Sequence, residues 1–449
     1  MASILYLYQS CQSAIIGYSY FLSTMKKPEI LAPAGSFETL QAAINAGADA
    51  VYFGIADFNM RATAAKNFTL GDLPEIVQIC RKAKVKTYVT VNTLLYNNEL
   101  EKMRKIIDAI KRIGISAIIA ADMATIEYAR EKGVEIHIST QLSISNTESL
   151  KFYSQFADRV VLARELSLEQ VKKIVEDIKE QKIKGPGGKL VEIEVFTHGA
   201  LCVAVSGRCA MSLYCYNRSA NRGKCTQMCR RRYKITDIET GKELEVDNNY
   251  VLSPADLCTI GMLPELIDAG VNVLKFEGRG RPPEYVDTVI RTYRQALEAI
   301  EKGEYGEDKI KEWTKELKKV YNRGFSTGLY MGRKGDEWAG IHGSKATQEK
   351  LLIGVVQKYY PKIQVIQIEI QAKSTIKEGE KFIITGPTTG IIKGKLAKMQ
   401  IDEKLVKEAT QNNVITFKIK GQARKNDKFF VVRKRKSLIP RGKESFLKD

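Results

Sequence analysis

Short apolar runs alternate with amphipathic segments from Glu29 through the first two thirds of the chain. The apolar runs, such as VKTYVTV and DRVVLAR, contain few polar residues, which is typical of parallel strands buried on both faces. The amphipathic segments end in Gly before the next run, as in NAGADAVYFG, and Gly is favoured just past a helix end. Strands are predicted at 30–32, 50–54, 86–92, 117–122, 135–139, 159–163, 192–197 and 271–277. Helices are predicted at 37–46, 70–83, 100–113, 123–132, 166–178, 263–269, 282–303 and 309–320.

Eight strand–helix units in roughly 280 residues predict an α/β fold with a (β/α)8 TIM-barrel-like domain. An open doubly wound sheet is the alternative, but no GxGxxG follows the first strand, which weakens a dinucleotide-binding version. The working residues of a barrel lie at the C-terminal ends of its strands. Those ends are polar here, and their polar residues are Asn59, Arg61, Asn92, Asp122, Ser139, Gln141, Asn146, Arg164, Glu165, His198, Glu277 and Arg279.

The pattern changes at Lys350 to short alternating strands separated by turns such as EGEK and GPTTG. No long helix intervenes, so a small antiparallel β-barrel domain is predicted. The predicted organisation is a poorly ordered extension at 1–24, the TIM-barrel-like domain at 25–335 with a cysteine-rich insertion at 200–234, a linker at 336–349, the β-barrel at 350–435 and a basic tail at 436–449.

Five of the eight cysteines fall in one segment, 194–233. Residues 200–234 also carry eight Lys or Arg and no Asp or Glu. Clustered thiols beside cations indicate a metal centre or a redox site in a reducing compartment. Cys80 and Cys258 differ, because both lie in apolar patterns and are predicted to pack in the core.

The spacing of the four candidate ligands is Cys202-x6-Cys209-x15-Cys225-x3-Cys229, with Cys215 between them. Structural zinc sites usually use two tight Cys-x2–4-Cys pairs, and only the last pair resembles one. Iron–sulfur clusters accept irregular spacings of four thiolates, so the spacing favours iron–sulfur over zinc without excluding zinc.

His198 lies four residues before Cys202, which allows a Cys/His nucleophile pair. A backbone-capping or substrate-contacting role is at least as common for a His at a strand end. No HExxH and no Walker loop occurs. The one GxSxG match, at 324–328, lacks the preceding strand and following helix of a nucleophile elbow. The sequence therefore offers no convincing hydrolytic machinery.

The net charge of +19 suggests a polyanionic partner, most often nucleic acid. A merely Lys-rich surface is the alternative reading. The last predicted strand leads into a basic run, RKRK, at 433–436. No apolar run reaches about 18 residues, so no transmembrane helix is predicted. We expect a cytoplasmic protein.

The cysteine segment resembles peptidase family U32, historically labelled collagenase-like peptidases. The resemblance is carried by EVFTHGALC at 194–202, SGRC at 206–209, and NRGKC at 221–225 with Cys229 and Arg230 after it. Supporting matches are LAPAGSFETLQAAINAGADAVYFG, FNMRA, STQLSISN, VVLARELSL, LKFEGRGRPPEYV and YNRGFSTGLY. The resemblance extends from Met25 to about residue 435 and so includes the predicted β-barrel.

The resemblance implies more than one activity. Some members of the family were named peptidases with no defined catalytic group. Others, similar to this chain in length and C-terminal barrel, act in RNA hydroxylation, either forming 5-hydroxyuridine at the tRNA wobble position or hydroxylating a ribosomal RNA cytidine. The resemblance to these members implies prephenate dependence and an iron–sulfur cluster, expected to be 4Fe-4S, on four cysteines. The matching positions are Cys202, Cys209, Cys225 and Cys229, and Cys215 is extra to that pattern.

The charge, the acid-free cysteine segment and the extra β domain favour the RNA-hydroxylating branch. We therefore expect hydroxylation of a tRNA wobble uridine, with tRNA or another RNA as partner and a second protein of the same family as a further partner. A peptidase, and an RNA-binding module with structural zinc, are the alternatives. Anion-binding residues are predicted to be Arg61, Arg164, Arg279, Arg230, Arg231 and Arg232. The candidate catalytic residues are His198, Glu165 and Glu277.

Overall fold

The computed structural model describes residues 27–435, except 64, 206–207, 245–249, 251, 333–336 and 342. Several predictions fall outside the described residues: the extension at 1–24, the tail at 436–449 and positions 336 and 342 of the linker. Among the described helices, none combines the length and apolar character needed to cross a bilayer.

Eight parallel strands form a closed barrel, because the last of them pairs with both the seventh and the first. The strands are β1 (Glu29–Pro33), β2 (Ala50–Gly54), β3 (Lys86–Val91), β4 (Ala117–Ala120), β5 (Ile136–Ile138), β6 (Arg159–Val161), β7 (Glu192–Gly199) and β11 (Val273–Phe276). The predicted TIM-barrel-like fold is confirmed, and each of the eight predicted strands overlaps one strand of the barrel.

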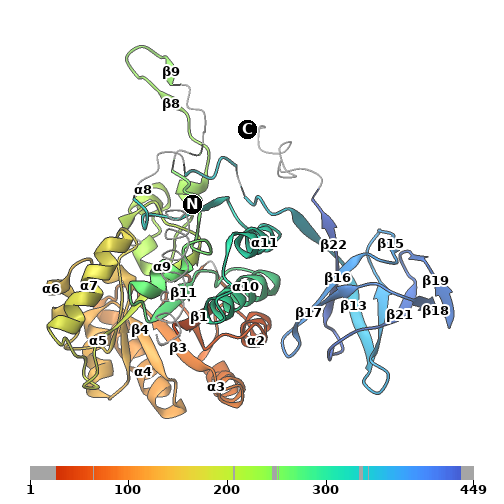
Figure 1. The fold of residues 1–449 in the computed structure, drawn as a ribbon, viewed down its shortest axis with the longest axis horizontal. Helices are drawn as coiled ribbons and strands as arrows, with labels where there is room; N and C mark the ends of the chain where they lie inside the picture. The colour runs from red at the N-terminus through yellow and green to blue at the C-terminus, as the bar shows by residue number, and fades with distance from the viewer. Residues whose placement is uncertain are drawn as a thin grey trace, which may run out of the picture.

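Helices follow most of the barrel strands and surround them (Figure 1). They are α2 (Phe37–Asn45), α3 (Leu73–Lys82), α4 (Leu100–Ile113), α5 (Met123–Glu131), α6 (Thr147–Tyr153), α7 (Leu168–Glu180), α9 (Leu263–Asp268), α10 (Pro283–Glu301) and α11 (Glu307–Leu317). The sequence pattern does not predict α6. That helix is short and buries only Leu150, so it carries little apolar periodicity.

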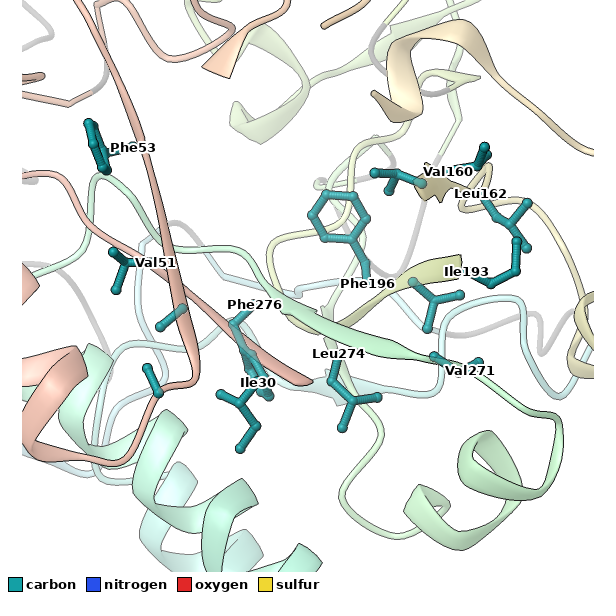
Figure 2. Packing of buried hydrophobic residues seen from close by; sticks show 14 of the residues in the cluster. Ile30, Val51, Phe53, Val160, Leu162, Ile193, Phe196, Val271, Leu274 and Phe276 are labelled. Carbon is teal, nitrogen blue, oxygen red and sulfur yellow. The ribbon is translucent and has the colours of Figure 1, made fainter. Parts of the chain in front are cut away.

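Alternate side chains of each barrel strand face the helices or the barrel interior. Figure 2 shows Ile30 and Leu274, on the adjacent strands β1 and β11, pointing to the same side, where they join the large outer core. The residues that alternate with these along each strand face the barrel interior, where a small separate cluster includes Tyr52 and Val273. On β11, Val273 and Lys275 lie two residues apart and therefore both face the barrel interior. The second of these inward-facing positions lies at the polar end of the barrel.

The alternation of barrel strands and helices is interrupted after β7. The chain passes through the cysteine segment, a short helix α8 (Met211–Tyr216) and a protruding hairpin of β8 (Ile235–Thr236) and β9 (Glu243–Leu244), seen at the top of Figure 1. It then returns along β7 as the antiparallel strand β10 (Asp256–Cys258), which also pairs with β12 (Phe325–Ser326). Neither β10 nor β12 is predicted, because each is a two- or three-residue strand.

The C-terminal part is an antiparallel sheet in the order β17-β16-β22-β13-β14-β21-β18-β19, with its own apolar core. Its strands are β13 (Gln348–Tyr360), β14 (Val365–Ile370), β15 (Ile376–Lys377), β16 (Lys381–Gly386), β17 (Gly390–Lys395), β18 (Met399–Ile401), β19 (Lys404–Val406), β20 (Glu408–Ala409), β21 (Val414–Lys418) and β22 (Lys428–Lys434). The predicted antiparallel β domain is confirmed. It lies beside α2 and α10 (Figure 1), where Lys393 pairs with Asp287 at 2.6 Å.

Candidate functional site

A cavity of about 240 Å³ lies at the C-terminal mouth of the barrel. Its floor and walls come from the ends of several barrel strands, and its rim comes from the cysteine segment. We refer to it as the thiol cavity, because Cys202, Cys225 and Cys229 line it. The barrel thus brings together, in one space, polar strand ends that are far apart in the sequence.

The thiol cavity is strongly cationic. Counted over the described residues, its lining contains a single carboxylate, Glu277, against seven cations. The cations are Arg61, Arg164, Arg230, Lys275, Arg279, Arg281 and Arg323. Such a surplus in a partly enclosed space attracts anions, and guanidinium groups pair bidentately with carboxylates and phosphates.

Glu277 and Arg61 form the central ion pair of the cavity. The Arg61 Nη2 atom lies 2.9 Å from Glu277 Oε1, and the Tyr52 hydroxyl donates to Oε2 at 3.3 Å. Burial pushes the pKa of Glu277 upward, but Arg61, then Arg279 and Arg164, outweigh it and lower the pKa to about 2. Glu277 is therefore an ionised carboxylate that stabilises guanidinium groups. The predicted acid/base role of Glu277 is not supported, because a group of this pKa has no proton to donate near neutral pH and is a weak base.

Two residues at or just after the ends of barrel strands fix the position of the Arg279 side chain. Its Nη1 donates to Asn59 Oδ1 and to Thr90 Oγ1, both at 2.9 Å. Burial lowers the pKa of Arg279 to about 10, although Tyr52 and Glu277 act in the opposite direction. Its Nε is buried without a hydrogen-bond partner among the described residues. This orphaned donor lies in a cavity lined by cations, which is the arrangement expected of a site that binds an anionic ligand.

Arg164 and Lys275 approach an aromatic wall. The Arg164 guanidinium lies 3.8 Å from the centre of the Phe196 ring, and its Nε is likewise buried without a partner among the described residues. Lys275 pairs with the buried Glu194 at 2.6 Å and lies 4.7 Å from the centre of the Tyr52 ring. This side of the cavity therefore combines flat apolar surfaces with fixed positive charge.

A set of uncharged polar side chains completes the floor. Asn92 Nδ2 donates at 3.0 Å to both Ser139 Oγ and Gln141 Oε1. These three residues come from the ends of β3 and β5, and all line the cavity. Amide groups present donors and acceptors side by side, which suits recognition of a heterocycle edge.

The four predicted ligand thiols lie near one another. Burial raises the pKa of Cys229, and Arg230 lowers it. The nearby thiols of Cys202, Cys225 and Cys209 also raise this pKa, because negative charges would repel one another. All four are free thiols. As placed, however, no group of three His, Cys, Asp or Glu side chains in the described part of the chain could hold a metal ion. The iron–sulfur cluster and prephenate stay predictions.

Two neighbouring residues attach the cysteine segment to the barrel. Arg222 donates to both carboxylate oxygens of Glu99, at 2.7 and 2.8 Å, and stacks 3.8 Å above the centre of the Tyr96 ring. Gly223 adopts a φ of 77°, and a Cβ there would lie 2.2 Å from the carbonyl oxygen of Asn59. Only glycine fits this close approach, so the NRGKC motif acts as a docking contact between the segment and the loop after β2.

The Arg230–Arg232 run divides between two environments. Arg230 enters the cavity wall, where its guanidinium donates to Ser253 Oγ at 2.9 Å and to the Pro254 carbonyl at 2.6 Å. Arg231 is exposed and donates to the Tyr216 hydroxyl at 2.7 Å, and Arg232 is exposed as well. Arg231 and Arg232 therefore lie outside the cavity, because the chain turns outward after Arg230, and their predicted substrate-binding role stays a prediction.

The structure does not place His198 in the thiol cavity. Its ring is not among the residues that line the thiol cavity, and it packs against Tyr285, Tyr293 and Phe325 instead. Burial lowers the pKa of His198 to about 3, so the imidazole stays neutral and cannot accept a proton near neutral pH. The structure therefore gives no support to a Cys/His nucleophile pair with Cys202, and the catalytic role of His198 stays a prediction.

The positions of Glu165, of Cys215 and of the two remaining cysteines bear on three further predictions. Glu165 does not line the cavity, so its predicted catalytic role has no geometric support. Cys215 is exposed and does not line the cavity as described, and its being extra to the ligand pattern stays a prediction. Cys80 and Cys258 are buried in the outer core, as predicted.

Sequence reasoning missed Lys275, Arg281, Arg323 and Tyr52 as lining residues. Lys275 and Tyr52 lie inside strands, and two-residue alternation would have placed them in the barrel interior. Arg281 follows a strand end in the run EGRGR, a signal that was available. Arg323 comes from a distant loop and is held by a buried pair with Asp256 at 3.1 Å, so no local pattern indicates it.

The fold and the site define a (β/α)8-barrel protein whose functional site lies at the C-terminal mouth of the barrel. The chain belongs to peptidase family U32, whose family model matches residues 35–340. This finding agrees with the resemblance of the cysteine segment.

Similar proteins carry two kinds of name. A collagenase of Porphyromonas gingivalis is 49% identical over 407 residues, which are 91% of this chain and 98% of that protein. The tRNA hydroxylation protein P1 of Bacillus subtilis is 35% identical, covering 81% of this chain and 84% of that protein. A 23S rRNA 5-hydroxycytidine synthase of Escherichia coli is 36% identical, covering 69% of this chain and 46% of that protein. The family thus includes relatives named for peptidase activity and for RNA hydroxylation.

Proposed function

We propose that this protein is an RNA hydroxylase that adds a hydroxyl group to a nucleobase, with a tRNA wobble uridine as the target. The observation that carries the proposal is the thiol cavity itself, where three of the four predicted ligand thiols, seven cations and a set of amide groups meet. RNA and a small organic anion are the ligands that this chemistry would attract. The relatives named for tRNA and rRNA hydroxylation support the same conclusion.

The donor set fits an iron–sulfur cluster. Cys202, Cys209, Cys225 and Cys229 would hold it, since four free thiols with irregular spacing suit such a centre. Replacing a C–H bond by C–OH withdraws two electrons from the base and adds an oxygen atom, so the reaction needs a two-electron acceptor and an oxygen donor from outside the protein. A bound cluster would supply one-electron transfer between them. The protein's own residues would bind and orient the other reactants.

Arg164 and Arg279 are the residues best suited to bind the carboxylates of a co-substrate. Each has an unpartnered buried Nε among the described residues, and both lie in the same cavity. Arg61 is already paired with Glu277, so it would assist rather than bind alone. Prephenate, which carries two carboxylates and a ring, would match this pair of guanidiniums and the adjacent Phe196 face.

The target base would bind against the amide groups. Uracil presents an acceptor, a donor and an acceptor along one edge, and the Gln141 amide nitrogen, whose neighbouring Oε1 already accepts from Asn92, can donate to one of these acceptors. A cavity of about 240 Å³ admits single bases and small anions but not a base pair. The nucleotide would therefore be single-stranded or flipped out of its stack.

The rim of the cavity suits single-stranded RNA. Tyr214, on α8, is 87% exposed, and Tyr216 is half-exposed beneath the Arg231 guanidinium. Aromatic faces beside cations are the usual means of holding unpaired bases, because stacking and phosphate contacts act together. The outward-facing Arg231 and Arg232 thus support RNA binding although they lie outside the cavity.

The proposal is tested by the nucleosides of cellular tRNA. A deletion strain is expected to lose 5-hydroxyuridine and its derivatives, and the wild-type gene is expected to restore them, whereas a gene encoding Arg164→Ala with Arg279→Ala is not. The measurement is mass spectrometry of digested tRNA and ribosomal RNA. Unchanged nucleosides in both RNA fractions of the deletion strain would exclude the RNA-hydroxylase assignment.

Peptidase activity is the second candidate, and the 49% identical relative named collagenase favours it. The geometry supports it poorly. Among the described residues, no His lines the cavity, the only carboxylate in the lining is the ionised Glu277, and the thiols lie in the same lining as the arginines. A cysteine nucleophile has no base within this lining to activate it. A zinc-containing RNA-binding module remains the third candidate and would bind RNA without altering its nucleosides.

Replacement of His198 distinguishes these candidates. His198→Asn is expected to leave RNA hydroxylation within a few-fold of wild type, because the ring is neutral and packed away from the cavity. A buried neutral His also makes stability rise with pH between about 3 and the ordinary value near 6.5, since the unfolded chain binds the extra proton there. We therefore expect this slope to weaken in the variant, measured by urea unfolding across that range. Gelatin cleavage that depends on both His198 and Cys202 would instead establish a peptidase.

A further inference from the structure

A second hollow, of about 620 Å³, lies between the barrel mouth and the C-terminal β domain. We call it the interdomain groove. Its barrel wall comes from the loops after β1, β2 and β11, and its opposite wall comes from β13, the β16–β17 turn and the start of β22. Arg279, Gly280 and Arg281 line both this groove and the thiol cavity. A ligand in the groove would therefore lie next to a ligand in the cavity.

The groove has cations with no neutralising partner. Lys66, on the barrel wall, and Lys428, on the β-domain wall, are exposed, and neither has an ion-pair partner among the described residues. Arg281 lies 3.4 Å from the centre of the Tyr321 ring, without a carboxylate partner in the described part of the chain. The groove lining includes one acidic residue, Glu38. Unpaired cations on facing walls are what a polyanionic strand requires.

The two walls are held in register. Lys350 pairs with Glu284 at 2.8 Å across the two domains, and Gly390, with a φ of 68°, packs so closely against α2 that a Cβ would lie 2.9 Å from the backbone nitrogen of Ala42. On the β-domain wall, Asp427 accepts from Thr389 Oγ1 at 2.6 Å and stabilises the turn after β16. The groove is therefore preformed, and binding in it would cost little ordering of the protein.

We propose that the interdomain groove binds the sugar–phosphate backbone of the RNA strand that flanks the nucleotide held in the thiol cavity. This inference rests on the proposed function. When a base occupies the cavity, the adjoining nucleotides must leave through its open side, and the shared residues 279–281 lead them into the groove. Lys66 and Lys428 would contact phosphates from opposite walls. Such contacts position the strand and carry no sequence preference.

The test is binding of a fluorescein-labelled anticodon stem-loop RNA to the full-length, cluster-loaded protein. Lys66→Gln with Lys428→Gln is expected to weaken binding about tenfold at low ionic strength and to reduce the slope of log K against log salt by about 0.7 for each phosphate that the variant no longer neutralises. The matched control is Lys362→Gln with Lys404→Gln, which removes the same charge from exposed lysines of the β domain outside the groove. The control is expected to bind like the wild-type protein.

Two further measurements separate the outcomes. Glu38→Gln removes the acidic residue of the groove and is expected to tighten RNA binding, a change opposite in sign that misfolding cannot produce. Iron and sulfide content is expected to stay unchanged in all these variants. If the wild-type protein binds the RNA and the groove variant binds equally well, the groove assignment is overturned while the proposed function stands. If the wild-type protein binds a gelatin peptide and no RNA, both are overturned.

Discussion

Replacing Cys225 or Cys229 by Ser is expected to remove iron and sulfide from the protein and to abolish RNA hydroxylation. The other three predicted ligands lie close enough to Cys229 to raise its pKa, and Cys225 lines the same cavity. Each of the two residues would therefore supply one of four thiolates to the cluster. A hydroxyl group binds iron far more weakly than a thiolate. We expect about four iron and four sulfide per chain in the wild-type protein and broad absorbance near ~400 nm after anaerobic purification, and we expect neither in the two variants.

The matched control for this experiment is Cys215→Ser. Cys215 lies in the same cysteine-rich segment, but it is exposed and is not among the described residues that line the thiol cavity. The control should therefore keep wild-type iron, sulfide and activity. A wild-type protein that contains one zinc and no iron, with unchanged RNA binding, would instead indicate the structural-zinc module. Equal iron loss in the Cys215 variant would contradict the four-ligand assignment.

Glu277→Gln is expected to destabilise the protein and, at the same time, to make its stability respond more strongly to small anions. Glu277 is the only carboxylate that the described part of the chain contributes to the lining, and its loss leaves Arg61, Arg164 and Arg279 to repel one another. Breaking a fully buried pair costs about 3–5 kcal/mol. A value of about 2 kcal/mol is expected here, because Arg61 keeps 29% of its side chain exposed and solvent screens the pair.

Malonate is a suitable probe, because it is a small dicarboxylate that can replace the missing charge. We expect malonate to raise the unfolding temperature of Glu277→Gln more than that of the wild-type protein. Glu380→Gln is the control, since its pair with Arg433 is similarly exposed but lies in the β domain, away from the cavity. A malonate response in Glu277→Gln no larger than in this control would contradict the role of Glu277 as the counter-charge of an anion site.

The pH dependence of the same variant follows from the lowered pKa of Glu277. The folded protein holds this pKa at about 2, whereas an unfolded chain holds it near ~4.3. The stability that the ionised carboxylate contributes is therefore complete above about pH 4.3 and is lost as the pH falls toward 2. The difference in unfolding free energy between wild type and Glu277→Gln should shrink over that range, as measured by urea unfolding.

Local patterns were sufficient to predict the barrel and many of the polar residues at its mouth, whereas the cysteine ligand set stays a prediction. Buried parallel strands need apolar residues on both faces, so their positions can be found from short windows of sequence. The polar ends at Asn92, Arg164, Glu277 and Arg279 follow from the same pattern, since a barrel places all strand ends at one mouth. The β domain was equally evident, because alternation with a period of two is itself local.

The sequence by itself therefore determined the architecture, the family and the gathering of thiols and arginines at one end of the barrel. Only the tertiary structure decided the state of each group. The pairing of Arg61 with Glu277 joins residues 216 positions apart, and that contact determines whether the carboxylate can carry a proton. The same holds for His198, which the aromatic side chains of α10 and β12 bury, and for Arg323, which Asp256 holds at the cavity. Burial and charge proximity depend on which segments meet in space, and short-range periodicity carries no information about that.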